Sequence, residues 1–327
     1  MILIICNKSD LCVDYVVRIL RQKGKKLLRL NTEDMPKREL TIRLPAFEYT
    51  IGDGLLTFDM RDLTSVWFRR PGRPYEDFPP EARPSAPIQQ YVVDQWNRAL
   101  DGLRALRNVL WINDPGKNQD AECKIRQLRM AREVGLNIPC TCITSRKSEA
   151  IDFAREHNGR IVAKALYSPL LEYPDKDYFI FTTAISSFED VSEEQFALAP
   201  VVLQELLSPK TDYRVTVVGK EVFACRIEST NGEQIPIDWR IKKNGLDFIP
   251  TAIPEDISTK CKDLVGRLGL VFGAIDLARV GDEYVFLEIN PNGEWGWLQD
   301  RFPIAETICE YLIAGANYVH QVPLECT

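Results

Sequence analysis

The first third of the chain alternates between two spacings of apolar residues. "MILIIC" and "SVWFRRP" (65–71) carry compact apolar runs that predict buried strands, whereas "DLCVDYVVRILRQKG" repeats its apolar positions at helical spacing. Further strands are predicted at "KKLLRLN" and "NVLWIND", an amphipathic helix over 88–108, and a hairpin around "IGDG". The alternation predicts a small α/β domain over residues 1–115.

The pattern changes after about residue 115. Helices are predicted over 119–135, 147–157 and 255–269, with a short acidic helix at "SEEQFALA" and a last helix from about 303. Strands are predicted at "GRIVAKAL", "YFIFTTAI" and "PVVLQELLS", followed by two antiparallel pairs, "DYRVTVVG" with "EVFACRIES" and "GAIDLARV" with "YVFLEIN". We therefore expect an α/β (α+β) chain that divides into 1–115, 116–190 and 191–327.

Composition then excludes several classes of function. The 327 residues carry a net charge of -6 and no long basic run, which argues against nucleic-acid binding. No apolar run approaches the roughly 20 residues that span a bilayer, so no membrane role is expected. Nine scattered cysteines without a C-x-x-C pair indicate free thiols in a reducing cytoplasm. The only two histidines, His157 and His320, argue against a histidine-ligated zinc site or a Ser-His-Asp triad.

Three oxygen-bearing side chains are predicted to meet near the end of the last strand. "FGAIDLARVGDEYVFLEINPN" predicts two antiparallel strands that turn at "VGDE", so Asp276 comes opposite the residues just before Glu288. Glu288 and Asn290 share one strand face, with Leu287 and Ile289 expected on the core face. Two carboxylates and an amide suit Mg²⁺ or Mn²⁺ and not zinc. The alternative is that they are ordinary polar groups on a half-exposed strand.

Several charged residues precede this site. Lys164 stands inside the apolar strand "RIVAKAL", where its ammonium either reaches a phosphate or guards a strand edge. Lys124 lies on a helix, where most lysines are merely solvated. Glu205 ends a buried strand, and the irregular "LLSP" segment that follows leaves backbone groups free to bind the edge of a nucleotide base. The alternative is that "LLSP" is a simple solvated bend. Three polar side chains follow on the next strand pair, namely Asp212, Arg214 and Arg226.

In their order along the chain, these features resemble an ATP-grasp ligase. The strand-borne lysine, the "QELL" hinge, the "DYR" strand and the Asp with E-x-N-P-N carry the resemblance over residues 115–327, and residues 1–115 resemble the preATP-grasp domain that precedes that fold. "SVWFRRP", "IPIDWR" (235–240) and "LEINPNGEWGWLQ" are most similar to the peptide-maturing ligases of the microviridin/graspetide type. "ALYSPLLEYPDKDYFIFTT" lacks the glycine-rich phosphate loop of glutamate-ligase relatives, which argues against an amino-acid ligase.

The resemblance implies roles for individual residues. The implied nucleotide-binding residues are Lys124, Lys164, Ser168, Glu205, Leu207 and Asp212, with Glu205 and Leu207 at the adenine hinge. The implied ligands of magnesium are Asp276, Glu288 and Asn290. Arg214 and Arg226 would neutralise the transferring phosphoryl group or an acyl-phosphate.

The resemblance also implies a peptide partner. Leader-peptide contacts are expected on a hairpin over 226–250 and on a neighbouring acidic segment with Glu189, Asp190, Glu193 and Glu194. Trp239 is expected to contact the peptide as well. Asp238 could orient a nucleophile and Arg240 could hold a substrate carboxylate, and a purely structural Asp238–Arg240 pair is an equal alternative.

The implied function is that of a cytoplasmic, homodimeric enzyme that uses ATP with Mg²⁺ or Mn²⁺. It would phosphorylate Asp or Glu side chains of a ribosomal precursor peptide and join them to Thr or Ser hydroxyls or Lys amines, giving macrocyclic esters or amides. Two alternatives stay open. One is an ATP-dependent ligase of amino acids or small carboxylates; the other is an ATP-binding regulator without catalysis, against which the complete set of acidic ligands and lysines argues.

Overall fold

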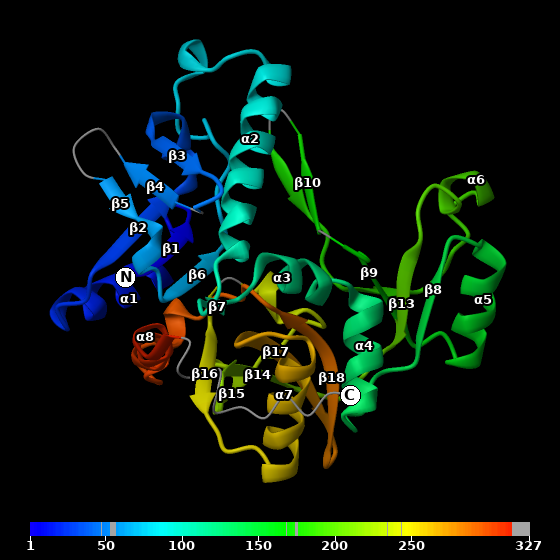
Figure 1. Ribbon diagram of the computed structural model, residues 1–327. Helices are drawn as coiled ribbons and strands as arrows, with labels where there is room; N and C mark the ends of the chain where they lie inside the picture. The colour runs from blue at the N-terminus through cyan, green and yellow to red at the C-terminus, as the bar shows by residue number, and fades with distance from the viewer. Residues whose placement is uncertain are drawn as a thin grey trace.

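The computed structural model describes residues 1–46, 48–52, 57–167, 169–173, 176–233, 235–242 and 244–315. In these ranges the strands form two four-stranded sheets, one five-stranded sheet, one three-stranded sheet and a separate two-stranded hairpin (Figure 1). None of the helices in the described part of the chain is long and apolar enough to cross a bilayer. The eight cysteines in those ranges are all free, as the sequence predicts.

The N-terminal sheet is parallel throughout. Its strands, in the order in which they lie in the sheet, are β2 (Leu27–Asn31), β1 (Ile2–Cys6), β6 (Ser65–Arg69) and β7 (Leu110–Ile112). A parallel strand is covered on both faces, which explains why the five residues of β1 are all apolar and buried. All four strands are confirmed.

Each face of this sheet has its own cover. On one face lie α1 (Leu11–Gln22) and, from the far end of the chain, α8 (Ile304–Ala314). On the other lie the end of α2 (Ala86–Asp101) and a small antiparallel sheet of β3 (Glu39–Arg43), β4 (Glu48–Gly52) and β5 (Thr57–Asp59). β4 and β5 confirm the hairpin, whereas β3 was not predicted. The last helix therefore completes the core of the first domain.

The helix predicted over 119–135 is two helices, α3 (Pro115–Ala121) and α4 (Lys124–Glu133). The first begins four residues early because the Asp114 carboxylate accepts hydrogen bonds from the Gly116 and Lys117 amides, and a proline suits the first helical position. The break between the helices makes Lys124 the first residue of α4, with its side chain free to reach forward to the large sheet.

The second four-stranded sheet, called the small sheet below, is antiparallel and carries the hinge that was predicted at "QELL". Its order is β12 (Thr183–Ile185), β9 (Ile161–Lys164), β13 (Val201–Glu205) and β8 (Thr141–Thr144). α5 (Lys147–Glu156) packs on it, and α6 (Glu193–Phe196) lies at its outer end. "YFIFTTAI" is not one strand: β11 (Asp177–Phe179) forms a separate hairpin with β10 (Leu170–Glu172), and the chain then turns into β12.

The large sheet is a five-stranded antiparallel sheet. Its order is β16 (Leu246–Pro250), β15 (Glu221–Ser229), β14 (Thr211–Val218), β17 (Phe272–Val280) and β18 (Glu283–Asn290). α7 (Glu255–Arg267) packs on one face over an apolar core, and α4 contacts the edge strand β18. The opposite face carries polar side chains from β14, β17 and β18, where these strands meet the small sheet.

Asn113, which the sequence analysis overlooked, ties the N-terminal sheet to the large one. Its side-chain oxygen accepts hydrogen bonds from the amides of Val271 (2.8 Å) and Phe272 (2.9 Å). Its side-chain nitrogen donates to the carbonyls of Phe272 (2.9 Å) and Pro291 (3.1 Å). The buried amide thus fixes both the start of β17 and the loop that leaves β18.

Candidate active site

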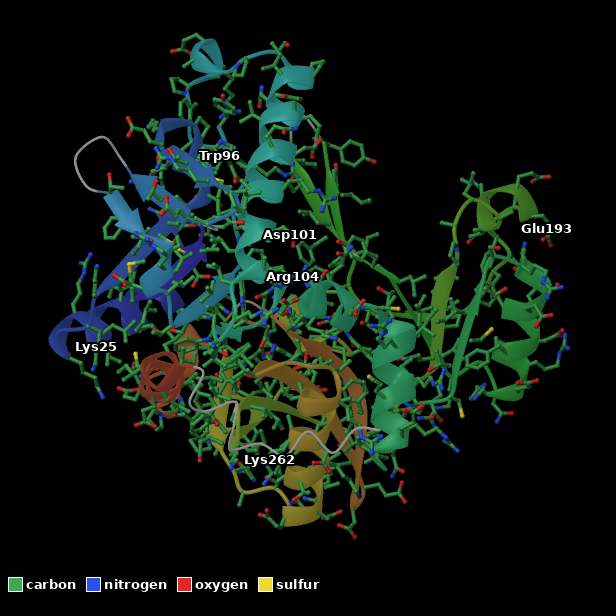
Figure 2. The ribbon with its side chains drawn as sticks, in the orientation of Figure 1. Lys25, Trp96, Asp101, Arg104, Glu193 and Lys262 are labelled. Carbon is green, nitrogen blue, oxygen red and sulfur yellow. The ribbon has the colours of Figure 1, made fainter. Side chains whose placement is uncertain are left out.

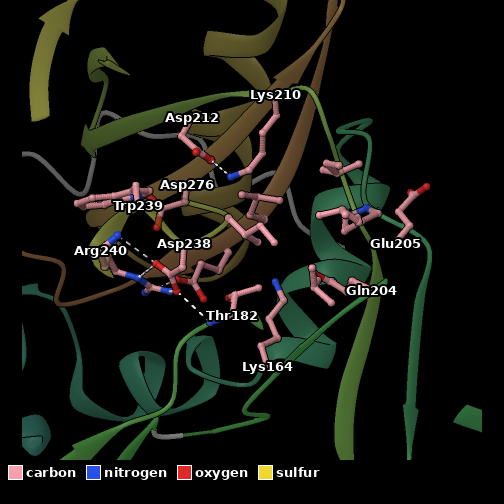
Figure 3. A pocket seen from close by; sticks show the side chains of 17 residues that line it. Lys164, Thr182, Gln204, Glu205, Lys210, Asp212, Asp238, Trp239, Arg240 and Asp276 are labelled. Carbon is pink, nitrogen blue, oxygen red and sulfur yellow. Dashed lines mark hydrogen bonds and ion pairs between the residues drawn. The ribbon is translucent and has the colours of Figure 1, made fainter. Parts of the chain in front are cut away.

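A cavity opens between the small sheet and the polar face of the large sheet (Figure 3). It encloses about 620 Å³ of space, with the open solvent at its mouth included. Residues of β9, β13, β14, β17 and β18, of the 237–240 segment and of the connections before β8, before β12 and after β13 line it: Pro139, Val162, Lys164, Thr182, Gln204, Glu205, Leu206, Leu207, Lys210, Asp212, Ile237, Asp238, Trp239, Arg240, Asp276, Leu287 and Glu288. Ten of the residues singled out in the sequence therefore meet in one place: Lys164, Glu205, Leu207, Asp212, Asp238, Trp239, Arg240, Asp276, Glu288 and, through its contact with Glu288, Lys124.

The two carboxylates are direct neighbours across the sheet. Asp276 pairs in register with Glu288 on one side and with Arg214 on the other. A bulge follows Asp276, so that Leu277 pairs with Phe286 and Leu287 is the extra residue. The expectation that Leu287 faces the core is therefore wrong, because the bulge brings it to the cavity wall.

Asp276 is a carboxylate with an unsatisfied oxygen. Its Oδ1 lies 3.1 Å from Nε of Arg214, but no hydrogen bond reaches this buried atom within the part of the chain that is described. Burial raises the pKa of Asp276 to about 6, against the charge of Arg214. A buried carboxylate oxygen without a donor, next to a second carboxylate, is the arrangement that a divalent cation satisfies.

Glu288 is surrounded by cations. Its two oxygens lie 3.3 Å from Nζ of Lys124 and 3.0 Å from Nη1 of Arg240. Burial pushes its pKa upward, but the charges of Lys124, Arg240 and Lys164 outweigh burial and lower the pKa to about 2. Asn290, two residues on, is exposed at the end of β18 and accepts a hydrogen bond from the Asn292 amide at 2.9 Å.

Lys164 is the last residue of β9, not a mid-strand residue, and its side chain points into the cavity (Figure 3). Burial lowers its pKa to about 8, and the nearby charge of Glu288 offsets only part of this effect. A cation that is poorly compensated in the ligand-free protein is ready to accept an anionic group of a ligand.

Asp238 and Arg240 form a bidentate pair, which favours the structural alternative for these two residues. Nε and Nη2 of Arg240 lie 2.8 and 2.9 Å from the two oxygens of Asp238. Asp238 also accepts a hydrogen bond from the Thr182 amide at 3.2 Å, across the cavity (Figure 3). Burial acts to raise the pKa of Asp238, and the hydrogen bonds from Arg240 lower it on balance. Since Arg240 also contacts Glu288, the pair links the 237–240 segment to the carboxylates.

The hinge borders the cavity with its backbone. Figure 3 shows the carboxylate of Glu205 directed away from the cavity, and its Oε1 accepts a hydrogen bond from the Cys140 amide at 2.8 Å. Asp212 is buried and paired with Lys210, a contact that the sequence analysis missed. Burial raises the pKa of Asp212, opposed by Lys210. The sequence around Lys210 does not predict this contact, because a lysine that follows Ser-Pro is typical of a solvated loop.

Arg226 and Arg214 are not among the residues that line the cavity. Arg226 pairs in register with Tyr213, so it shares the face of Tyr213 and not that of Arg214, and it forms an ion pair with Glu228 at 2.8 Å. Arg214 itself lies beside the cavity, with its guanidinium 5.6 Å from the ring of Trp239. Ser168 lies outside the described residues.

The expected peptide-binding elements are not neighbours. α6, with Glu193, lies at the outer end of the small sheet, whereas β16 forms the far edge of the large sheet (Figures 1 and 2). Trp239 lines the cavity and packs edge-on against Phe248 and Trp297. A further apolar surface, missed in the sequence, lies on the β10–β11 hairpin, whose exposed side chains include Leu171, Tyr173, Tyr178, Phe179 and Ile180.

Fold and cavity together define the class: the chain has the ATP-grasp fold, and it is similar over nearly its whole length to ATP-grasp ligases. It is similar to the macrocyclase MdnC from Microcystis aeruginosa, solved with the precursor peptide MdnA, at 26% identity and a TM-score of 0.84, over 96% of this chain and 99% of that one. It is similar as well to a RiPP-associated ATP-grasp ligase from Chryseobacterium gregarium, solved with ADP and a leader and core peptide, at 27% identity and a TM-score of 0.83, over 95% and 96% of the two chains. The predicted resemblance to the peptide-maturing branch is thereby confirmed.

A RimK domain protein from Sphaerobacter thermophilus shares the fold alone, at 13% identity and a TM-score of 0.56, over 95% of this chain and 99% of that one. No protein-family model and no curated protein matches the chain.

Proposed function

We propose that the protein uses ATP to activate Asp or Glu side chains of a ribosomal precursor peptide and crosslinks them to Thr or Ser hydroxyls or Lys amines. The observation that carries this proposal is the cavity, where two lysines, two arginines and two in-register carboxylates converge below a backbone hinge. The similarity to MdnC and to the Chryseobacterium ligase over nearly the whole chain supports a peptide as the carboxylate donor.

The residues present fit a magnesium ion. Asp276 and Glu288 supply adjacent carboxylates, one with an oxygen that lacks a hydrogen bond, and Asn290 follows at the end of the same strand. Such an oxygen-only donor set suits Mg²⁺, with Mn²⁺ as a substitute. The ion would supply charge neutralisation at the phosphates of ATP during transfer.

The chain's own residues then account for the two steps. In the first, a carboxylate oxygen of the peptide attacks the γ-phosphorus, ADP leaves, and an acyl-phosphate forms; Lys124 and Lys164 would hold the phosphates and offset the charge that develops there. In the second, a hydroxyl or amine attacks the acyl carbon and loses its proton, and phosphate leaves. Arg214 and Arg240 would stabilise the oxyanion of that step. Arg226 is left out, because its side chain lies on the other face of the sheet.

The nucleotide would lie along the hinge. Backbone groups between Glu205 and Leu207 border the cavity and can hold the adenine edge, with the Asp212–Lys210 pair nearby. The peptide would enter past Trp239 and contact two surfaces: the exposed β10–β11 hairpin and the acidic segment with Glu189, Asp190, Glu193 and Glu194. The proposal includes a cytoplasmic homodimer, whose mass light scattering would measure. It also includes a division into domains at residues 115 and 190, which limited proteolysis would test.

The test is peptide-dependent ATP consumption. Purified protein with Mg²⁺ is given, in separate reactions, the precursor peptide encoded beside its gene, the leader segment alone and a mixture of the twenty amino acids. We expect ADP release only with the full precursor. ADP release with free amino acids would instead establish the small-molecule ligase, and nucleotide binding without turnover under every condition would establish the regulator.

A further inference from the structure

Three side chains that can ligate a metal converge behind the hinge, outside the cavity. One ligand atom from each of Cys140, His157 and Glu205 lies within 4.8 Å of the others. They come from different elements: Cys140 just before β8, His157 at the C-terminal end of α5, and Glu205 at the end of β13. Thiol sulfur, imidazole nitrogen and carboxylate oxygen together are a donor set that Zn²⁺ accepts.

The imidazole is oriented for ligation. Nδ1 of His157 lies 2.9 Å from the carbonyl oxygen of Phe153. A carbonyl only accepts, so Nδ1 carries the hydrogen and Nε2 presents its lone pair. A metal-ligating histidine usually donates its other ring nitrogen in this way, which fixes both tautomer and ring orientation. The ring of Phe153, with its centroid 4.3 Å from that of His157, holds the imidazole further.

The carboxylate is available because Glu205, although it borders the cavity, directs its carboxylate away from it (Figure 3). Its side chain turns away from Lys164 and Asp276 and lies against Cys140, whose amide it binds through Oε1 at 2.8 Å (Figure 3). The Cys140 carbonyl in turn accepts a hydrogen bond from the Glu205 amide at 3.1 Å. These two bonds hold the cysteine and the glutamate in a fixed relation, so the ligand positions do not depend on a flexible loop.

We propose that Cys140 Sγ, His157 Nε2 and a carboxylate oxygen of Glu205 bind one divalent transition-metal cation of the Zn²⁺ type, with water as the fourth ligand. The scarcity of histidine argued against such a site in the sequence, but one histidine suffices when sulfur and carboxylate complete the set. Bound there, the cation joins α5 and the start of β8 to the residue that begins the hinge. Metal occupancy is therefore expected to change nucleotide affinity, and nucleotide to change metal affinity by the same factor.

The site is separable from the proposed magnesium site by its chemistry. A thiol must lose its proton to bind a cation, so cation binding at Cys140 should release a proton and weaken as the pH falls. The group at Asp276, Glu288 and Asn290 offers oxygen ligands only. A cation with a sulfur ligand therefore reports on the hinge and not on the cavity.

The test uses Co²⁺ added to the reduced, chelator-treated full-length protein. We expect one equivalent to give a sulfur-to-cobalt charge-transfer band with four-coordinate d–d bands, which Zn²⁺ removes and Mg²⁺ does not. Cys140→Ser should abolish the charge-transfer band, and His157→Gln should weaken Co²⁺ affinity at least about tenfold. Cys123→Ser, at another exposed cysteine, is the matched control and should leave the band unchanged.

Circular dichroism and thermal melts of the metal-free variants establish that each is folded. No saturable charge-transfer band in the wild type, or a band that persists in folded Cys140→Ser, would overturn the site. Asp276→Asn should keep the band, and its loss there would assign the cobalt to the cavity instead. Because this readout needs neither ATP nor peptide, it stands or fails independently of the proposed ligase activity.

Discussion

Two buried ionic clusters lie on either side of the loop that leaves β18, and they are built differently. In the first, Nε of Arg69 lies 3.0 Å from Oδ2 of Asp10, with side chains only 2% and 1% exposed. Nη1 of Arg69 also donates to the Gly293 carbonyl at 3.1 Å, and Nη2 to Glu294 at 3.2 Å. In the second cluster, the cavity, burial raises the pKa of Asp276 to about 6 and lowers the pKa of Lys164 to about 8.

The difference separates a cluster that holds the fold from one that awaits a ligand. Both Nη groups of Arg69 donate to the 293–294 loop, and its Nε lies beside the carboxylate of Asp10 that caps α1, so Arg69 fixes the N-terminal sheet against that loop. The cavity charges are brought together without complete pairing, which costs stability in the ligand-free protein and favours phosphate and a divalent cation when they arrive. Stability and function should therefore respond in opposite ways to mutation in the two clusters.

The largest expected effect is on catalysis, from Glu288→Gln. The substitution keeps the shape but removes the charge that contacts Lys124 and Arg240 and that would hold Mg²⁺. We expect peptide-dependent ADP release to fall by about 10³-fold or more, the scale of losing an electrostatic catalytic group. A coupled ADP assay measures it. Asn290→Asp, which keeps an oxygen ligand, is the comparison variant, and full activity of Glu288→Gln would remove the metal assignment.

The next effect is on stability, from Arg69→Gln. Removing one partner of a buried, multiply bonded pair leaves Asp10 charged and uncompensated, which costs about 3–5 kcal/mol in the free energy of unfolding. Urea denaturation measures this loss. Arg70→Gln is the matched control, since Arg70 is half-exposed and pairs with the half-exposed Glu294, and it should cost at most about 1 kcal/mol. Equal losses in the two variants would contradict the distinction between the clusters.

Lys164→Met should separate stability from catalytic function within the cavity. The pKa of Lys164 is lowered from 10.5 to about 8, which means that the charged form is disfavoured in the folded protein. The uncharged, similarly shaped methionine should therefore stabilise the ligand-free protein by about 1–3 kcal/mol. ADP release should be lost. The cost of the wild-type lysine is fully present below pH 8 and is relieved between pH 8 and 10.5, where the unfolded chain binds more protons.

The wild type should therefore approach the stability of Lys164→Met as the pH rises through that window. Thermal melts of both proteins at pH 7 and pH 10 measure the difference. A variant that is less stable than the wild type at pH 7 would show that Lys164 is fully compensated in the fold.

The smallest effect is expected at the surface, from the double substitution Glu193→Gln and Glu194→Gln. These exposed carboxylates on α6 should strengthen peptide binding by about two- to fivefold, mostly through the association rate and at low salt. Fluorescence anisotropy with a labelled leader peptide measures the change. ADP affinity is the internal control and should be unchanged, because α6 lies at the outer end of the small sheet. An unchanged affinity for the peptide would remove this acidic surface from the proposal.

The sequence predicts the fold and most of the cavity because both depend on local patterns. Apolar spacing identifies the parallel strands, and the alternation around Glu288 with the Asp276 strand predicts the register to within one residue. What it missed depends on tertiary packing. The bulge that turns Leu287 to the cavity, the buried Asn113 and the Lys210–Asp212 pair leave no periodic signal. The start of α3 at Pro115, four residues before the predicted helix, was readable from Asp114-Pro115, a capping signal that helical periodicity obscured.

The central claim is that the cavity condenses a peptide carboxylate with a peptide nucleophile at the expense of ATP. The most direct measurement is the intact mass of the precursor peptide after incubation with the protein, ATP and Mg²⁺, together with the ADP released. The proposal predicts the loss of one water per crosslink, one ADP for each water lost, and no mass change with Glu288→Gln or without ATP. A peptide of unchanged mass in a reaction that releases ADP would contradict it.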